Sequence, residues 1–157
     1  MNTRTARPAL ALAMTAAALT AAAPAFAGGT DVVKGKLSAL AAGVDRGYEI
    51  SGPVRLQRRA DSTTVRLNVR GLQGRTTYMA HLHEAPCEQS GGGHYQDDPE
   101  GGTTPPNELW LTIETNPSGN GHAGSTEHWA VRDGDRSVVI HDAEDGAKIA
   151  CADLPLG

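Results

Sequence analysis

The sequence predicts an all-β domain, a sandwich or barrel built from short strands. Apolar and polar residues alternate in several segments, which is the period-2 pattern of a strand with one buried face. Turn residues separate these segments, and 19 glycines and 9 prolines interrupt the chain. No segment keeps the 3.6-residue apolar period of a long amphipathic helix. Short strands at this spacing are typical of β-sandwiches and barrels.

The predicted strands follow one another through the middle of the chain. The clearest covers residues 64–70, where Val65, Leu67 and Val69 alternate with polar residues. The other candidates are residues 48–57, 77–83, 109–113 and 137–141. Glycine-rich and aspartate-rich segments between them are typical of hairpin turns.

Two stretches do not follow the strand pattern. Residues 28–46 contain valines and leucines without clear alternation, so the sequence leaves open whether they form an edge strand or stay loose. Residues 84–107 are rich in glycine and proline, and Cys87 lies near their start. A loop of this length in a compact domain is usually functional or disordered. We expect a functional loop, because a disulfide at Cys87 would hold it in place.

The first 27 residues have the features of a secretory signal peptide. Arg4 and Arg7 precede an apolar, alanine-rich run over residues 9–23, and Ala27 ends a small-residue cleavage motif. A membrane anchor is the alternative, but a spanning helix needs about 20 apolar residues with suitable flanks. We therefore expect cleavage after Ala27, a secreted protein with no membrane anchor, and a single domain over residues 28–157.

Charge argues against some partners. Residues 28–157 keep 12 of the 14 basic residues and all 18 acidic ones, a formal charge of −6. An acidic surface argues against nucleic acid or an anionic membrane as a partner.

Cys87 and Cys151 both lie beyond the predicted signal peptide. Oxidising conditions outside the cytoplasm allow a disulfide, so we expect the two residues to be paired. Such a bond would close a loop of about 65 residues and contribute roughly 4 kcal/mol in the chain-entropy model. Two free thiols or a thiolate metal site are the alternatives.

Four histidines are candidate metal ligands. His81 and His83 are two residues apart in a predicted strand, and side chains at that spacing point to the same face. His94 follows three glycines in the long loop, and His141 ends an apolar run. Three or four imidazoles suit Cu(II), and Zn(II) also accepts them. Surface histidines that bind nothing are the alternative.

The order of these residues resembles the signatures of the copper/zinc superoxide dismutase family. The similarity covers residues 48–154 and includes four histidines and two cysteines. The matching motifs are His81-Leu82-His83-Glu84, Cys87, Gly93-His94-Tyr95, Val138-Val139-Ile140-His141-Asp142 and Gly146-Ala147-Lys148-Ile149-Ala150-Cys151.

The resemblance implies a fold and a ligand set. The fold is an eight-stranded, immunoglobulin-like Greek-key barrel or sandwich, as in that family. His81, His83 and His141 correspond to copper ligands. His94 corresponds to the ligand that joins copper to zinc in two-metal members. The family's disulfide corresponds to Cys87 and Cys151.

The sequence departs from the family at the zinc site. Two further histidines of the two-metal members are absent between His94 and Leu109, and Glu108 stands where their aspartate would be. We therefore expect copper without zinc, as in the copper-only dismutases. A metal-bound histidine usually donates its other N–H to an oxygen acceptor. We hypothesise that Glu108 is this acceptor for His94.

Further departures concern the rim of the site and its surroundings. Only nine residues separate His141 from Cys151, where the family has a much longer charged loop. Lys148 replaces the arginine that guides superoxide, and it keeps the charge without the planar fork of donors.

We expect Trp110 and Trp129 to pack on the barrel.

The resemblance implies the dismutation of superoxide to oxygen and hydrogen peroxide by copper alone. His94 would take up and return a proton, and Lys148 would supply local positive potential. The first alternative is a copper storage or delivery module on the same fold. The second is a metal-free interaction domain. The sequence leaves the oligomeric state open, with a monomer slightly favoured.

Overall fold

The structure is a computed structural model and describes residues 29–157. The signal peptide predicted for residues 1–27 lies outside the described residues. Within residues 29–157, no helix has the length and apolar character needed to cross a membrane.

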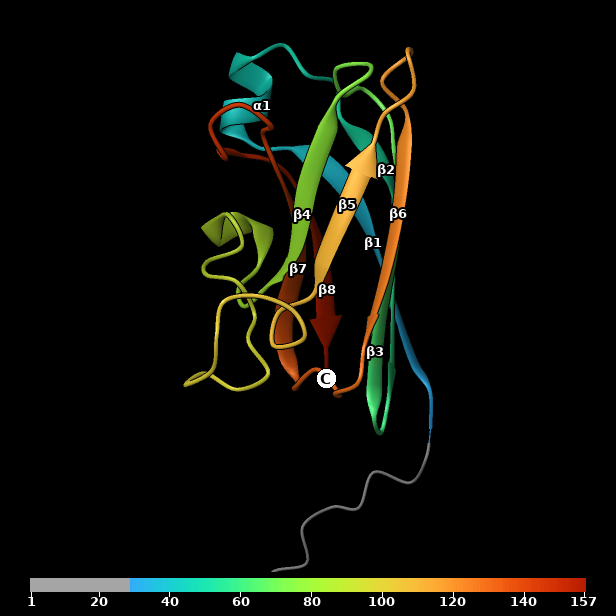
Figure 1. The fold of residues 1–157 in the computed structure, drawn as a ribbon, viewed down its shortest axis with the longest axis vertical. Helices are drawn as coiled ribbons and strands as arrows, with labels where there is room; N and C mark the ends of the chain where they lie inside the picture. The colour runs from blue at the N-terminus through green and yellow to red at the C-terminus, as the bar shows by residue number, and fades with distance from the viewer. Residues whose placement is uncertain (1–28) are drawn as a thin grey trace, which may run out of the picture.

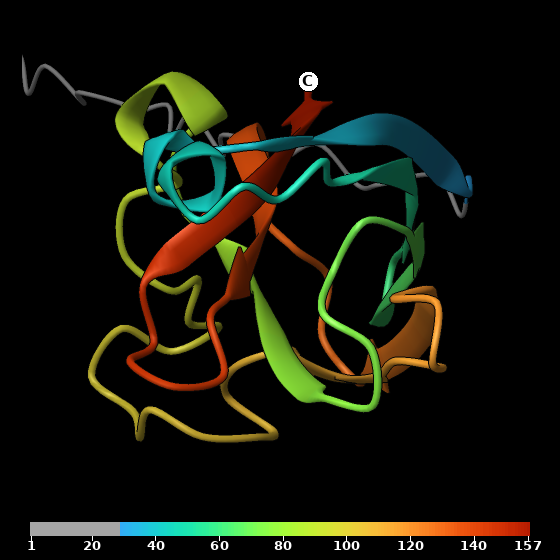
Figure 2. The ribbon, with the colours of Figure 1, turned by 90° about the horizontal axis from the view of Figure 1, so that it is seen from above.

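In the described chain, eight antiparallel strands form one sheet that curves into a nearly closed barrel (Figures 1 and 2). The order across the sheet is β5-β4-β7-β8-β1-β2-β3-β6, and the two end strands pack against each other. The prediction of an all-β barrel is confirmed. The strands are β1 (Asp31–Ala39), β2 (Ser51–Arg59), β3 (Ser62–Val69), β4 (Thr77–His83), β5 (Trp110–Glu114), β6 (Gly121–Glu127), β7 (Gly134–His141) and β8 (Lys148–Leu156).

The five predicted strands correspond to β2, β3, β4, β5 and β7, with ends that shift by a few residues. The open question about residues 28–46 is resolved, because they contain strand β1 and the short helix α1 (Ala41–Asp45). Strands β6 and β8 were not among the predicted segments. The ladder with β7 holds β8 in the sheet, and the case of β6 is different. Its sequence, GHAGSTE, has no large apolar residue, and the full-length ladder with β3 holds it in the sheet.

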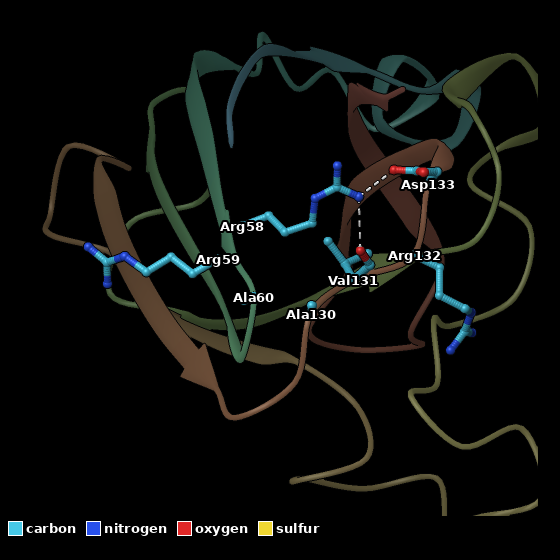
Figure 3. Close-up of a pocket in the computed structure, with 7 residues that line it drawn as sticks. All are labelled: Arg58, Arg59, Ala60, Ala130, Val131, Arg132 and Asp133. Carbon is cyan, nitrogen blue, oxygen red and sulfur yellow. Dashed lines mark hydrogen bonds and ion pairs between the residues drawn. The ribbon is translucent and has the colours of Figure 1, made fainter. Parts of the chain in front are cut away.

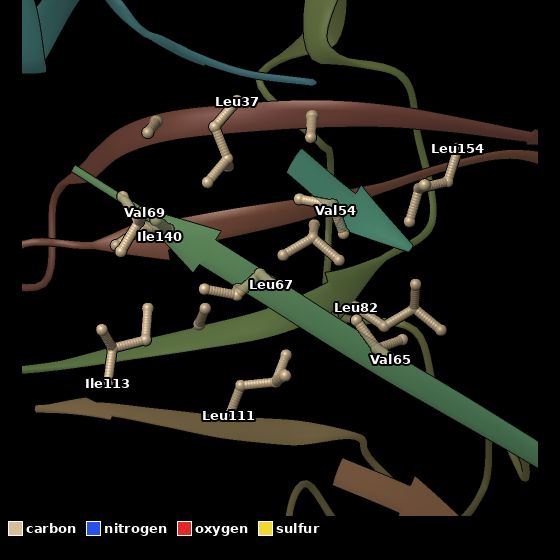
Figure 4. Packing of buried hydrophobic residues seen from close by; sticks show 14 of the residues in the cluster. Leu37, Val54, Val65, Leu67, Val69, Leu82, Leu111, Ile113, Ile140 and Leu154 are labelled. Carbon is tan, nitrogen blue, oxygen red and sulfur yellow. The ribbon is translucent and has the colours of Figure 1, made fainter. Parts of the chain in front are cut away.

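Alternate positions of the strands fill the barrel, as the period-2 pattern predicts (Figure 4). Val65 and Leu67 of β3 point inward and are buried, whereas Arg66 between them is exposed. Burying a side chain of this size stabilises the fold by about 1.5–3 kcal/mol relative to leaving it exposed. The core labelled in Figure 4 consists of Leu37, Val54, Val65, Leu67, Val69, Leu82, Leu111, Ile113, Ile140 and Leu154.

A buried arginine joins the first strand to the connection between β6 and β7. Arg58 on β2 is only 4% exposed. Its guanidinium contacts the carboxylate of Asp133 at 2.5 Å and the carbonyl of Val131 at 3.2 Å (Figure 3). It also contacts the carboxylate of Asp31 at 2.7 Å. A buried charge is tolerated when it is paired and hydrogen-bonded in this way. These contacts link three parts of the chain at one end of the barrel.

The long connection between β4 and β5 lies outside the barrel, beside β4 and β7 (Figures 1 and 2). A backbone hydrogen bond from Tyr95 to Leu82 of 2.8 Å ties it to β4, and the Tyr95 side chain is buried. Its short helix η1 (Cys87–Gln89) begins at the cysteine that bonds to Cys151 of β8. The predicted disulfide is therefore present. Disulfides of this kind are typical of oxidising, extracytoplasmic compartments.

Candidate metal centre

Two paired strands and the long loop bring the four histidines together. His81 and His83 belong to β4, His141 ends β7, and His94 lies in the loop. In the ladder between β4 and β7, Met79 faces His141, so His81 is the diagonal neighbour of His141 on the same face. An isolated bridge between His83 and His94 fixes the loop against the end of β4.

The imidazole rings are close enough to share one ion. Ring centroids lie 4.2 Å apart for His81 and His94, 5.1 Å for His81 and His141, and 4.7 Å for His83 and His94. One ring nitrogen from each of His81, His94 and His141 lies within 4.8 Å of the others. The Nε2 atoms of His83 and His141 are 3.3 Å apart. The structure therefore places all four candidate ligands in one cluster.

Hydrogen bonds fix which nitrogen of each ring is available. The Nδ1 atoms of His83 and His141 donate to the carbonyls of Gly92 and Gly146, at 3.1 and 2.9 Å. Nδ1 of His94 lies 2.8 Å from a carboxylate oxygen. A neutral imidazole that donates from one nitrogen has its lone pair on the other. These three rings therefore present Nε2 to the cluster.

His81 is different, because its Nδ1 is the free atom. This nitrogen is buried and has no hydrogen-bond partner. Leaving a buried polar atom unpaired costs about 1–3 kcal/mol. A metal ion bound at Nδ1 would remove this cost. The unsatisfied nitrogen is therefore the observation that points most directly to a ligand.

Burial keeps the rings of His81, His83 and His141 neutral. It lowers the pKa of His81 to about 4, with a further contribution from His94 and His141. It also lowers the pKa of His83 to about 3 and that of His141 below its ordinary value. Metal ligands must be unprotonated. The site is therefore prepared for a cation at neutral pH.

Glu108 is the buried carboxylate that accepts from His94, and it is 2% exposed. Its Oε2 also accepts from Nε1 of Trp110 at 2.8 Å, and its Oε1 accepts from Nε2 of Gln96 at 3.3 Å. Burial raises its pKa, but the hydrogen bonds from Trp110 and His94 outweigh burial and leave the pKa below its usual value. The carboxylate is therefore charged and fully engaged.

Trp110 is a residue of the site that the sequence did not reveal. Besides the bond to Glu108, its ring stands edge-on to His81 with 5.0 Å between centroids. It faces His81 directly in the ladder between β4 and β5. Only the strand register brings it to the histidines, and the sequence pattern carries no signal for that register.

Lys148 of β8 lies at the edge of the cluster. Its Nζ donates to the carbonyl of Gly92 at 2.5 Å, and the same carbonyl accepts from His83. Its charge contributes to lowering the pKa of His83 and His141. Lys148 thus combines a positive charge near the rings with a bond that holds the loop.

The short connection after β7 holds His141. Backbone bonds between Asp142 and Ala147 and between Gly146 and Asp142 close it into a tight turn, which presents the Gly146 carbonyl to the ring. Arg46, directly after α1, pairs with Asp142 at 3.6 Å and with Asp145 at 2.6 Å. The helix therefore supports the turn from outside.

Ring nitrogens of His81, His94 and His141 are close enough together to hold one metal ion, with His83 beside them. The cluster opens to solvent at His94, whose side chain is 32% exposed. The chain matches no protein-family model and no curated protein sequence.

Proposed function

We propose that the protein is a copper-dependent superoxide dismutase that works without zinc. The observation that carries this proposal is the convergence of His81, His94 and His141, with His83 beside them. In this cluster His81 has an unpaired buried nitrogen and His94 donates to a buried carboxylate. The same four histidines carry the resemblance of the sequence to the copper/zinc superoxide dismutase family.

The topology is compatible with the proposed Greek-key barrel. The connections from β3 to β4 and from β6 to β7 join strands that are not neighbours in the sheet. Long returns between antiparallel hairpins are the feature that defines a Greek key.

Copper fits the donor set better than zinc. Nδ1 of His81 and Nε2 of His83, His94 and His141 would hold the ion. Cu(II) favours nitrogen ligands in a tetragonal arrangement. When bound, copper supplies the one-electron chemistry that dismutation requires, whereas Zn(II) has no redox chemistry.

The protein residues have separate tasks in this reaction, which converts two superoxide ions and two protons to oxygen and hydrogen peroxide. Nε2 of His94 would carry a proton only while it is not bound to the ion, and it would give that proton up when it binds the ion again; the partly exposed ring lets solvent supply the proton. Glu108 keeps the His94 ring in place through Nδ1. Lys148 attracts the anion on an otherwise acidic protein.

Metal analysis and a superoxide assay on one preparation test the proposal. We expect one copper per chain, no requirement for zinc, and catalysed loss of superoxide. Replacing His81 with Ala should abolish both copper retention and activity. His122, which is exposed on β6, provides the matched control for this substitution. Tight copper binding without turnover would favour a storage or delivery module, and failure to bind Cu(II) would refute the metal centre.

A further inference from the structure

The outer face of strands β1, β2 and β3 carries a cluster of positive side chains, which we call the basic face. All five of its cations are exposed, although the chain from residue 28 has a formal charge of −6. None of the outward-facing residues of β1, β2, β3 or the neighbouring β6 is acidic. The basic face consists of Lys34, Lys36, Arg55, Arg66 and Arg70.

Three of these cations stand in one row across the sheet. Lys34 faces Arg55 in the ladder between β1 and β2, and Arg55 faces Arg66 in the ladder between β2 and β3. Neighbouring strands are about 4.8 Å apart. Like charges directly opposite each other destabilise a sheet. The row therefore lowers the stability of the fold, and folding alone does not account for it.

The cations of the basic face have no partners in the described chain. None of the five makes an ion pair or a side-chain hydrogen bond there, whereas Arg46 and Arg58 pair with aspartates. Arg132, Arg136 and Lys148 donate to backbone carbonyls. Several cations elsewhere in the described chain are thus paired, whereas the five of the basic face are available.

Protection of a sheet edge explains only part of this pattern. β1 pairs with β8 only at Ser38 and Ala39, so lysines on β1 can prevent edge-to-edge association. Arg55 and Arg66 lie on β2 and β3, which have neighbours on both sides. A hollow of about 560 Å³ lined by Lys34, Lys36 and Arg70 adds a recess to the surface.

We propose that the basic face binds a linear polymer with a phosphate diester in each repeat. Arginine and lysine together bind phosphate oxygens. Lys34, Lys36, Arg55 and Arg66 follow one another at about 5–7 Å along and across the strands, which suits successive anions of a flexible chain. The face has no tryptophan, tyrosine or phenylalanine for bases to stack on, which disfavours single-stranded nucleic acid. Its one large exposed apolar residue is Val32, too little to anchor the protein in a lipid surface.

Strands β2 and β3 lie on the opposite side of the barrel from the long loop and from β4 and β7 (Figures 1 and 2). Most of the basic face is therefore far from the elements that carry the histidines. Binding there would leave the metal centre open to solvent, and it does not depend on the proposed dismutase activity.

A glycerol-phosphate polymer tests the proposal directly, with binding measured over a range of salt concentrations. We expect log K to fall linearly with log salt. Arg66→Ser should weaken binding by about two- to fivefold and reduce the slope by about 0.7. Arg75→Ser removes the same charge from an exposed position outside the basic face and should leave binding almost unchanged.

Two further measurements make the result specific. Arg66→Ser should keep or raise the melting temperature, because it removes a like-charge contact, so lost binding cannot be assigned to unfolding. Phosphatidylglycerol vesicles present the same phosphate chemistry on a lipid, and we expect weaker binding to them and to single-stranded DNA. No salt-dependent binding to the polymer, an equal effect of Arg75→Ser, or tighter binding to vesicles or DNA would overturn the proposal.

Discussion

His94 donates from Nδ1 to the carboxylate of Glu108 over 2.8 Å, and the two side chains differ sharply in exposure, 32% against 2%. A partly exposed imidazole is thus attached to a buried, charged anchor. The anchor occupies Nδ1, so Nε2 is the nitrogen left for a metal ion or a proton. This separation of tasks leads to the first prediction.

Replacing Glu108 with Gln should weaken copper binding by about 10- to 100-fold, the range found for partners of metal-bound histidines. The amide keeps one oxygen to accept from His94 and Trp110, but it loses the charge and turns an N–H₂ group toward Gln96. Competition with a Cu(II) chelator measures the change. Glu114→Gln, at the exposed end of β5, the strand that begins two residues after Glu108, is the matched control. Equal copper affinity in both variants would remove Glu108 from the site.

Tryptophan fluorescence should report the metal. The chain has two tryptophans, and only Trp110 contacts a candidate ligand, whereas Trp129 packs on Tyr95 with 5.4 Å between ring centroids. Bound Cu(II) quenches a nearby indole, so we expect quenching during titration. Trp110→Phe should lose most of this response and Trp129→Phe should keep it. The reverse result would place the ion away from His81.

The strands and the placement of His81 and His83 on one face could be predicted from the sequence, because both depend on local alternation. Tyr78, Ala80 and Leu82 are buried in the core, and this places His81 and His83 on the outer face. No longer-range information is needed for that step.

Features that depend on register between distant strands could not be predicted. Trp110 reaches His81 only because β4 and β5 pair as they do, and the row from Lys34 to Arg66 exists only in the assembled sheet. The negative net charge of the chain also hid the basic face, because a net charge sums over all surfaces of the molecule. An acidic chain can still present a basic face.

The metal-free protein should lose stability in mild acid. His81 and His83 have folded-state pKa values of about 4 and 3, against 6.5 in the unfolded chain. Below pH 6.5 the unfolded state therefore binds more protons, and the free energy of unfolding falls by up to about 1.4 kcal/mol per pH unit for each histidine. The loss continues until the pH reaches the folded-state values.

Urea unfolding of the metal-free protein between about pH 7 and about pH 5 measures this dependence. In His83→Gln the free energy of unfolding should depend less steeply on pH, because one of the two buried bases is gone. His122→Gln, which changes an exposed histidine, should keep the pH dependence of the unmodified protein. A midpoint that does not move with pH would show that the two rings are not buried in their neutral form.

Lys148 allows the proposed attraction of superoxide to be separated from support of the loop. Its ammonium group lies near His83 and His141 and donates to the Gly92 carbonyl, which also accepts from His83. Lys148→Met keeps an apolar stem and removes the charge, so the rate with superoxide should fall and depend less on ionic strength. Lys34→Met, on the basic face, removes the same charge far from the histidines and should change the rate little. Copper content measured on both variants completes the test. If Lys148→Met retains its copper but reacts slowly, the charge of Lys148 attracts the anion. If it loses copper, the bond to Gly92 matters more than the charge.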